Sequence, residues 1–569
     1  MPANHEPWWR RTVVYQIYPR SFADSDGDGI GDLGGILGRL DYLADLGVET
    51  LWLSPFYPSP QADFGYDISD YTDVDPAYGD LASCERLIDE AHRRGLRGVL
   101  DLVLNHTSDQ HPWFVASRAS RDDPKRDWYV WRDGARPGGA APPNNWFNMI
   151  GGRGWHYDAS SDQWYWAQFL PFQPDLNYRH PEVREAMLGV VRWWMDKGVD
   201  GFRLDIVNAL FEDEQFRDNP FQWKLLPSAE DPSMLFRSTE HTLNHPDTLA
   251  FMRELRRVVD GHDGRDRFLV GEVIAPIEEA REFCGAAADG LHLIFLFDSL
   301  TAPLRADAVR ALLQRYERLF AEPLLPTWVF GNHDRRRRIS RLGGSFEQAK
   351  LNAAWQLTAR GVPFLYNGEE VGIEQHHLPV GDSLDAVVAR FRNWPQALFD
   401  GLCALAGESL NRDECRTPMQ WSDAPHAGFC PAAVDPWLPV TPSFRERNVA
   451  RQQGDVDSLW HCYRRLLHAR RESRALHAGA QELLPADSLP ATVVGYDRFS
   501  AGDDDGGWVR VLLNCAPESA AVTVPAGARP WISTRARPPA VAGGQVRLRP
   551  WEGLLLAGDG PRPTPGKPS

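Results

Sequence analysis

The sequence lacks three features that would direct it to a membrane, to nucleic acid or out of the cell. No stretch approaches 18 uninterrupted apolar residues, and residues 1–22 lack the apolar run of a signal peptide. Basic residues are not in excess, because the net charge is -17 and the only basic run, Arg335 to Arg338, is short. We therefore expect a cytoplasmic protein, a monomer or small homo-oligomer, that binds neither nucleic acid nor membrane.

Cysteine is also scarce. The 7 cysteines are an odd number and are scattered without paired spacing, which argues against a disulfide framework and for a reducing compartment. The remaining composition, 43% hydrophobic and 24% charged, is ordinary for a folded protein. A chain of 569 residues is too long for one core of usual size, so two or three domains are expected.

Short apolar runs rich in β-branched residues alternate with longer segments of helical period. Apolar strands that alternate with helices predict a parallel sheet covered on both faces. Eight such units favour a (β/α)₈ TIM barrel over an open doubly wound sheet. The predicted strands lie within residues 12–19, 49–55, 96–106, 201–207, 267–273, 291–299, 327–334 and 362–370.

Two long segments interrupt this pattern, and a different pattern follows it. Residues 107–178, rich in Trp, Asn, Gly and Pro, are too long for an ordinary loop and predict a small inserted domain after the third strand. Residues 373–454 form a second excursion. The sequence thus predicts a barrel from residues 1–106 and 179–477, a C-terminal antiparallel β-sandwich over 478–558, and a disordered tail over 559–569.

Polar residues gather at the ends of the predicted strands. In a parallel barrel these ends meet at one face, where function is concentrated. A single strand-end aspartate often caps the next helix, so the convergence of several is the informative feature. Three acids at one face suit glycoside hydrolysis, whereas the HExxH and GxSxG motifs of zinc and serine hydrolases are absent. The polar residues are Asp101, Asn105, His106, Arg203, Asp205, Glu272, His333 and Asp334.

Several short motifs lie on the predicted strands and follow one another in a characteristic order. "DLVLNH", "GFRLDIV", "GEV" and "FGNHD" closely resemble the four signature regions of the α-amylase family, glycoside hydrolase family 13, and "QPDLN" (173–177) resembles its fifth region. "GYDISDY" (65–71), "YNGEEVG" (366–372) and "RTPMQW" (416–421) resemble its α-glucosidase and oligo-1,6-glucosidase branch. The resemblance implies a retaining glycoside hydrolase with a catalytic barrel, an inserted domain, a C-terminal β-domain and no organic cofactor.

The same resemblance implies catalytic roles for three carboxyl groups. Asp205 corresponds to the nucleophile, Glu272 to the general acid/base and Asp334 to the residue that stabilises the transition state. Arg203 lies two residues before Asp205 on the same strand face and would favour its charged form. Glu272 must keep its proton until the leaving oxygen takes it, so we expect a raised pKa.

The resemblance also implies residues that bind the sugar. His106 and His333 would hydrogen-bond glucosyl hydroxyls, and Tyr66 would stack on the sugar ring. Asp67 and Arg416 resemble the pair that clamps the non-reducing end and makes a blind pocket, which favours exo-action. Phe169 resembles an aromatic residue near the entrance.

The residue after the nucleophile is often linked to linkage specificity in this branch. Here it is Ile206, whose bulk resembles the valine of α-1,6-acting relatives more than the threonine or alanine of α-1,4-acting ones. We therefore expect an exo-acting α-glucosidase that accepts α-1,6 links, with a small oligosaccharide or glucoside as substrate. A glucosyltransferase or isomerase acting on sucrose or trehalose is the alternative on the same scaffold.

An acidic loop, "DSDGDGIGD", spans residues 24–32. Its first residues match an EF-hand calcium loop, but Gly35 stands where that loop needs its glutamate. The loop resembles the one that binds a divalent ion in the α-glucosidase branch. By that resemblance the ligands are four carboxylates and one backbone carbonyl, which suit a structural Ca²⁺, or less comfortably Mg²⁺. They are Asp24, Asp26, Asp28, Asp32 and the carbonyl of Ile30.

Overall fold

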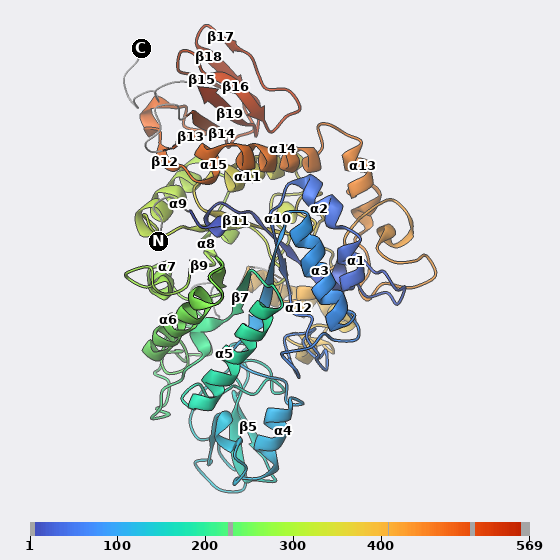
Figure 1. Cartoon of the computed structure of the whole chain (residues 1–569), viewed down its shortest axis with the longest axis vertical. Helices are drawn as coiled ribbons and strands as arrows, with labels where there is room; N and C mark the ends of the chain where they lie inside the picture. Colours follow the sequence, from blue (N-terminus) through green and yellow to red (C-terminus); the bar gives the residue numbers. More distant parts are fainter. Residues whose placement is uncertain (1–5, 226–230, 408, 501–506, 559–569) are drawn as a thin grey trace.

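The computed structural model describes residues 6–225, 231–407, 409–500 and 507–558, so the tail predicted over 559–569 lies outside the described residues. Within these ranges, no helix combines the length and the apolar composition that a membrane span requires. Figure 1 shows the barrel in the middle, the segment with α4 (Pro112–Ala119) and β5 (Trp155–Asp158) at one end, and the C-terminal strands at the other.

The centre of the molecule is a parallel sheet of eight strands in the order β10-β11-β1-β2-β3-β7-β8-β9. Every neighbouring pair is parallel, which confirms the predicted (β/α)₈ barrel. The strands are almost wholly buried because helices cover them outside and side chains fill the barrel inside. They are β1 (Val14–Ile17), β2 (Thr50–Leu53), β3 (Arg97–Val103), β7 (Gly201–Asp205), β8 (Phe268–Gly271), β9 (Leu293–Ile294), β10 (Thr327–Val329) and β11 (Val362–Tyr366).

Side-chain hydroxyl groups close the barrel between β9 and β10. Thr327 Oγ1 donates to the Ile294 carbonyl oxygen at 2.8 Å, and Ser299 Oγ donates to the Val329 carbonyl oxygen at 2.7 Å. No strand ladder pairs β9 with β10 within the described ranges. The strand predicted over 291–299 is therefore only two residues long, because its far end turns into helix α8 instead of pairing.

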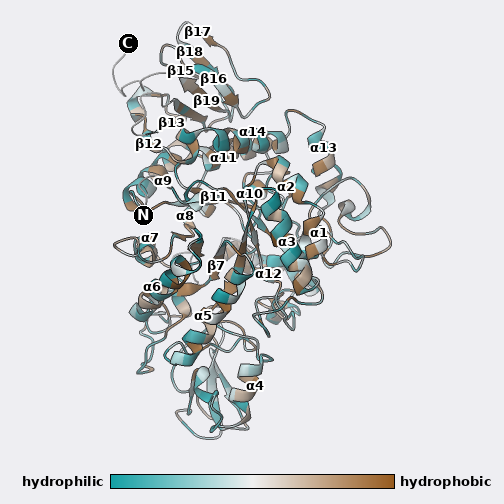
Figure 2. Cartoon of the chain, in the orientation of Figure 1, coloured by the Kyte–Doolittle hydropathy of each residue, from teal (hydrophilic) through white to brown (hydrophobic). Residues whose placement is uncertain are grey.

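Amphipathic helices surround the strands. At the start of α3 the N-cap Asp80 accepts from the Ser83 amide at 2.8 Å, and Ser83 Oγ accepts from the Asp80 amide in return. The buried face of the helix is formed by Cys84, Leu87, Ile88 and Ala91. Figure 2 shows hydrophilic and hydrophobic residues together on α3 and α5. The barrel helices are α1 (Leu33–Leu37), α2 (Leu40–Leu46), α3 (Leu81–Arg93), α5 (Pro181–Asp196), α6 (Pro246–Gly261), α7 (Ile277–Ala280), α8 (Asp298–Thr301), α9 (Ala306–Leu319), α10 (Arg338–Arg341), α11 (Phe346–Thr358) and α14 (Leu459–Glu472).

Residues 107–178 form a small unit beyond the end of β3. Helix α4 (Pro112–Ala119) precedes a three-stranded antiparallel sheet of β4 (Trp131–Arg132), β5 (Trp155–Asp158) and β6 (Gln163–Trp166). Its core is aromatic, with Trp146, Trp155, Trp164 and Trp166 buried together. Because the unit follows the end of β3, it lies at the face of the barrel where the strands end, which is where the site is expected (Figure 1).

The C-terminal part packs on the barrel through α11. Residues Ala349 to Thr358 of α11 are all buried, because the helix contacts α14 on one side and the C-terminal sheet on the other. A five-stranded antiparallel sheet is formed by β12 (Ala480–Leu483), β13 (Val493–Phe499), β14 (Trp508–Asn514), β19 (Gly553–Gly558) and β16 (Arg529–Ser533). A second sheet has β15 (Ala520–Thr523), β18 (Gln545–Leu548) and β17 (Val541–Ala542). The excursion after β11 carries α12 (Gln396–Ala406) and α13 (Val449–Gln453), and α15 (Arg474–His477) leads into the sheets.

Candidate active site

The strand ends bring the predicted polar side chains together at one face of the barrel. Residue Asp101 of β3 lies in register with Arg203 of β7, and the Glu272 amide after β8 donates to the Leu204 carbonyl oxygen at 2.9 Å. Asp205 and Glu272 are each 7% exposed, whereas Asp334 after β10 is half-buried. The convergence expected from the parallel strands is therefore present.

The buried guanidinium of Arg203 links three carboxyl groups. Its Nη1 donates to Asp205 Oδ1 at 2.6 Å and to Asp101 Oδ1 and Oδ2 at 2.8 and 3.1 Å. Its Nη2 donates to Glu272 Oε2. One cation thus serves three acids, so the cluster cannot carry all three charges without a net negative charge in a buried place.

Burial shifts the pKa of two of these acids, Glu272 and Asp101. Burial raises the pKa of Glu272 to about 8, although the charge of Arg203 opposes the rise. Burial likewise raises the pKa of Asp101 to about 7 against the same arginine. A glutamic acid that keeps its proton at neutral pH can donate it, which is the property expected of a general acid.

Asp334 is shifted in the other direction. Burial acts to raise its pKa, but the guanidinium groups of Arg416 and Arg412 outweigh burial and bring the pKa below its usual value. Arg416 Nη2 donates to Asp334 Oδ1 at 2.7 Å. Asp334 therefore remains a carboxylate beside a glutamic acid that holds its proton.

A hydrogen-bond chain fixes His333 at the floor of the site. Gln16 Nε2 donates to His333 Nδ1 at 2.7 Å, so the ring proton is assigned to Nε2, which lies 2.6 Å from the Tyr66 hydroxyl. That hydroxyl in turn donates to Asp101 Oδ2 at 3.3 Å. Burial lowers the pKa of His333 to about 3, so the ring is neutral. The hydroxyl group of Tyr66, the residue predicted to stack on the sugar, therefore belongs to this series of hydrogen bonds.

His106, which follows β3, also contacts Tyr66. It is buried, and its Nε2 lies 3.2 Å from the Tyr66 carbonyl oxygen. Burial lowers its pKa, which keeps it neutral. Phe169 lies 5.3 Å from the His106 ring between centroids and also packs near Ile206. Ile206 has a left-handed backbone (φ 34°) that turns the chain sharply after Asp205.

Asp67 and Arg416, the residues expected to clamp the non-reducing end of the sugar, have separate partners within the protein. Asp67 accepts from Ser59 Oγ at 2.8 Å and from the Asp63 amide at 3.0 Å, whereas Arg416 pairs with Asp334. The structure thus gives the two residues of the predicted clamp separate partners. The ion pair at this end joins Arg412 Nη2 to Asp63 Oδ1 at 2.6 Å.

Sequence reasoning missed Asp63 and Arg412, although each had a signal. Asp63 precedes Asp67 by four residues, and Arg412 precedes Arg416 by four residues in "NRDECR". Both residues lie just before a family motif, Asp63 before "GYDISDY" and Arg412 before "RTPMQW". Asp101 was seen as a strand-end acid but was not assigned to the site.

Removing the shared cation should destabilise the fold strongly. We expect Arg203→Met to lower the free energy of unfolding by about 3–5 kcal/mol, because three buried carboxyl groups lose their counter-charge. The native state would hold protons that the unfolded chain releases above about pH 4, so stability should fall as pH rises from about 5 to 8. Urea denaturation at pH 5 and at pH 8 measures the free energy of unfolding of both proteins. If Arg203→Met lost the same stability at both pH values, the loss of counter-charge would not be its cause.

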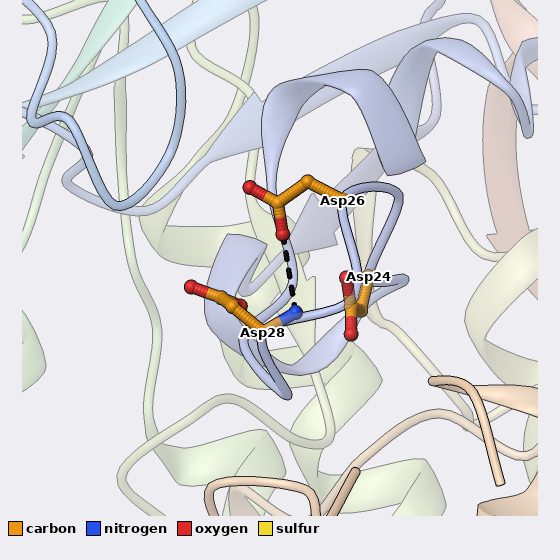
Figure 3. A group of neighbouring side chains, drawn as sticks. All are labelled: Asp24, Asp26 and Asp28. Atoms are coloured by element: carbon orange, nitrogen blue, oxygen red, sulfur yellow. Dashed lines mark hydrogen bonds between the residues drawn. The ribbon is translucent and has the colours of Figure 1, made fainter. Parts of the chain in front are cut away.

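The acidic loop brings three of its predicted ligands together. Oxygen atoms of Asp24, Asp26 and Asp28 lie within 4.8 Å of one another (Figure 3). Burial and the neighbouring charge of Asp28 raise the pKa of Asp26. Asp32 is placed differently, because its Oδ1 accepts from the Gly35 amide at 2.6 Å and caps α1, and its Oδ2 accepts from the Ser25 amide at 2.8 Å.

Comparison with known proteins decides the family. Residues 16–479 match the family described as "Alpha amylase, catalytic domain". The chain belongs to the α-amylase family. This α-amylase-family chain is 41% identical over 531 residues to a "Probable alpha-glucosidase" of Rhizobium meliloti, which covers 91% of both chains.

Two further similarities extend over most of this α-amylase-family chain. An "Oligo-1,6-glucosidase" of Heyndrickxia coagulans is 38% identical over 506 residues, covering 84% of this chain and 88% of the relative. The crystal structure of the "alpha-glucosyl transfer enzyme" XgtA superposes with a TM-score of 0.85 at 37% identity, covering 97% of this chain and 100% of XgtA. The predicted family and branch are thereby confirmed.

Proposed function

We propose that this chain is a retaining, exo-acting α-glucosidase that hydrolyses terminal α-glucosidic bonds of short oligosaccharides or glucosides. The observation that carries the proposal is the pair of acids held by one arginine: Asp205 and Glu272 both contact Arg203, and Glu272 has a pKa raised to about 8. The names of the relatives, α-glucosidase and oligo-1,6-glucosidase, support the same activity.

The proposed mechanism has two steps. Asp205 attacks the anomeric carbon while Glu272 gives its proton to the leaving oxygen, which forms a covalent glucosyl ester on Asp205 and frees the aglycone. Glu272, now a carboxylate, removes a proton from water, which attacks the ester and releases α-glucose. Asp334 offers a charged group for the glucosyl hydroxyls, the buried Arg416 holds it in place by donating to its Oδ1, and His106 and His333 are neutral partners for the same hydroxyls.

The proposed exo-action follows from the Asp63–Arg412 ion pair. It links the loop after β2 to the excursion after β11, and Gln173 Nε2 donates to Asp63 Oδ2 at 3.0 Å from the inserted unit. Three segments thus meet at this point, which would leave room for one terminal glucosyl unit.

A substrate panel tests the proposal. We expect release of glucose from 4-nitrophenyl α-glucoside, maltose and isomaltose, with the α-anomer appearing first by NMR. First release of the β-anomer, or no turnover of any α-glucoside, would reject it. A new disaccharide from maltose or sucrose in place of free glucose would support the glucosyltransferase or isomerase alternative, which the likeness to the "alpha-glucosyl transfer enzyme" favours.

Ile206 is the proposed determinant of linkage preference. It is 7% exposed and packs with Ala209 and Leu243, with Met149 and Phe169 against them, so the aglycone side has an apolar wall. We expect kcat/KM for isomaltose to equal or exceed that for maltose. Ile206→Thr should shift the ratio towards maltose by about 10-fold. Maltose cleaved far faster than isomaltose by the unaltered enzyme would contradict this assignment.

We also propose that the acidic loop holds a structural Ca²⁺, with Mg²⁺ as a weaker occupant. The clustered oxygens of Asp24, Asp26 and Asp28 fit a hard cation, and the Ile30 carbonyl and Asp32 would complete the set. The loop packs against the segment before α13, where the Trp437 amide donates to the Gly29 carbonyl oxygen at 3.0 Å. The ion would therefore join two segments of the chain, remote from the reacting groups, and take no part in the reaction.

Removal of the ion should lower stability without changing specificity. We expect chelation to lower Tm by several degrees, since a ligand at about 100 times its Kd contributes about 2.7 kcal/mol. Asp28→Asn should lower Tm and abolish the response to chelator, while Asp122→Asn, an exposed aspartate of the inserted unit, should change neither. An unchanged Tm after chelation would contradict the proposal, and elemental analysis would identify the ion.

Cytoplasmic location is proposed as well. The structure leaves all seven cysteines as free thiols, and six of them are buried, which suits a reducing compartment.

A further inference from the structure

Asp385 lies in the excursion after β11 and is fully buried. Its carboxylate receives four hydrogen bonds, three of them from one residue. Arg412 donates from Nη2 to Oδ1 at 2.7 Å, from Nε to Oδ2 at 3.0 Å and from its backbone amide to Oδ2 at 3.0 Å, and the Val387 amide donates to Oδ1 at 3.0 Å. These hydrogen bonds to the Asp385 carboxylate therefore come from Arg412 and from the turn that contains Asp385.

Arg412 serves two other carboxylates at the same time. Its Nη2 also donates to Asp63 Oδ1 at 2.6 Å, and its Nη1 lies 3.5 Å from Asp334 Oδ1. A carboxylate that binds the Nε and Nη2 edge of an arginine fixes the plane of the guanidinium. Asp385 therefore decides where the remaining nitrogen atom of Arg412, Nη1, points, and that nitrogen faces the carboxylate of Asp334.

We infer that Asp385 is a positioning residue, which fixes the Arg412 guanidinium between Asp63 and Asp334 and so shapes the end of the pocket that receives the terminal glucosyl unit. This inference rests on the proposed α-glucosidase function. It assigns a role to residues 373–415 of the excursion, which precede the motif "RTPMQW" and which no motif of the sequence explained. Without Asp385, Arg412 would keep two carboxylate partners but lose the one that holds its plane, and Nη1 would compete with Arg416 for Asp334.

A purely structural role for Asp385 makes a different prediction, and Asp413 provides the matched control. Asp413 is also fully buried in this excursion, and its Oδ2 accepts from the Leu384 amide at 2.7 Å and from the Asp385 amide and Ser383 Oγ at 3.0 Å. It supports the same turn through backbone and hydroxyl groups. If Asp385 only supported the turn, replacing either aspartate by asparagine would have the same consequences.

The test measures kcat and KM for 4-nitrophenyl α-glucoside together with Tm. We expect Asp385→Asn to raise KM about 10- to 100-fold with a smaller change in kcat, whereas Asp413→Asn should lower Tm and leave KM within about twofold. In an Arg412→Ala background, Asp385→Asn should add less than about twofold to KM, because the effect passes through Arg412.

Two outcomes would overturn the inference: a wild-type KM in Asp385→Asn, or a KM effect of undiminished size in the Arg412→Ala background. If Asp385→Asn does not fold, Arg412→Lys decides, since lysine keeps the charge but cannot bind Asp385 through two side-chain nitrogen atoms at once. It should raise KM as Asp385→Asn would, and an unchanged KM would reject the positioning role. Failure of the unaltered enzyme to cleave any α-glucoside would instead reject the proposed function itself.

Discussion

Asp205→Asn should lower kcat for 4-nitrophenyl α-glucoside by about 10⁴-fold or more, since an amide oxygen cannot form the glucosyl ester that the mechanism requires. Asparagine keeps the size of the side chain and an oxygen that can accept from Arg203 Nη1, which lies 2.6 Å from Asp205 Oδ1. We therefore expect substrate binding and Tm to change little. Stopped-flow and steady-state rates measure the loss of turnover.

Asp101→Asn is the matched control for this variant. Asp101 contacts the same Arg203 nitrogen at 2.8 Å, so its replacement also removes one carboxylate from that cation. If the loss in Asp205→Asn arose from disturbing Arg203 alone, both variants would lose similar activity. We expect Asp101→Asn to lose at least 100-fold less than Asp205→Asn. Turnover in Asp205→Asn within 100-fold of the unaltered enzyme would remove Asp205 from the nucleophile role.

Glu272→Gln should lower kcat/KM for maltose or isomaltose by about 10²- to 10⁴-fold, because the leaving sugar oxygen then departs without a proton. The loss should be much smaller for an aryl α-glucoside whose leaving phenol is acidic, since that oxygen needs little protonation. The dependence on the leaving group separates an acid catalyst from a residue that only shapes the site. An equal loss for both substrates would contradict the assignment.

The pH profile provides an independent measurement for Glu272. Burial raises its pKa to about 8, so the group carries its proton below that pH and loses it above. We expect kcat/KM to fall as pH rises above about 8, and this alkaline limb should vanish in Glu272→Gln. Glu212 is the control, because it is another buried glutamate whose pKa burial raises to about 8. Glu212→Gln should keep the limb.

Arg203 explains how a glutamic acid can keep its proton inside this cluster of carboxyl groups. It shares one positive charge among Asp101, Asp205 and Glu272, so the cluster is most stable when part of it is protonated. The half-buried Asp334 receives its own cations, Arg416 at 2.7 Å and Arg412 at 3.5 Å. The division of the arginines between the acids therefore decides which of them keeps its charge.

Local sequence patterns determined much of this protein. The eight strands were located because each is an apolar run bounded by helical segments, and the clustering of Asp24, Asp26 and Asp28 follows from their spacing within one loop. The family motifs named Asp205, Glu272 and Asp334, and parallel strands bring their ends together wherever those strands form one barrel. These features depend on residues near one another in the chain, or on a topology that the repeat itself indicates.

Only the tertiary structure decided which partners those residues receive. Arg412 and Asp63 are 349 residues apart, and Asp385 comes from an excursion with no recognisable period, so no local pattern could pair them. The hydroxyl groups of Thr327 and Ser299 that close the barrel, and the capping of α1 by Asp32, likewise depend on the assembled packing. The physical reason is that ion pairs form between whichever charges the finished fold places in contact, and the sequence specifies those distances only through the whole fold.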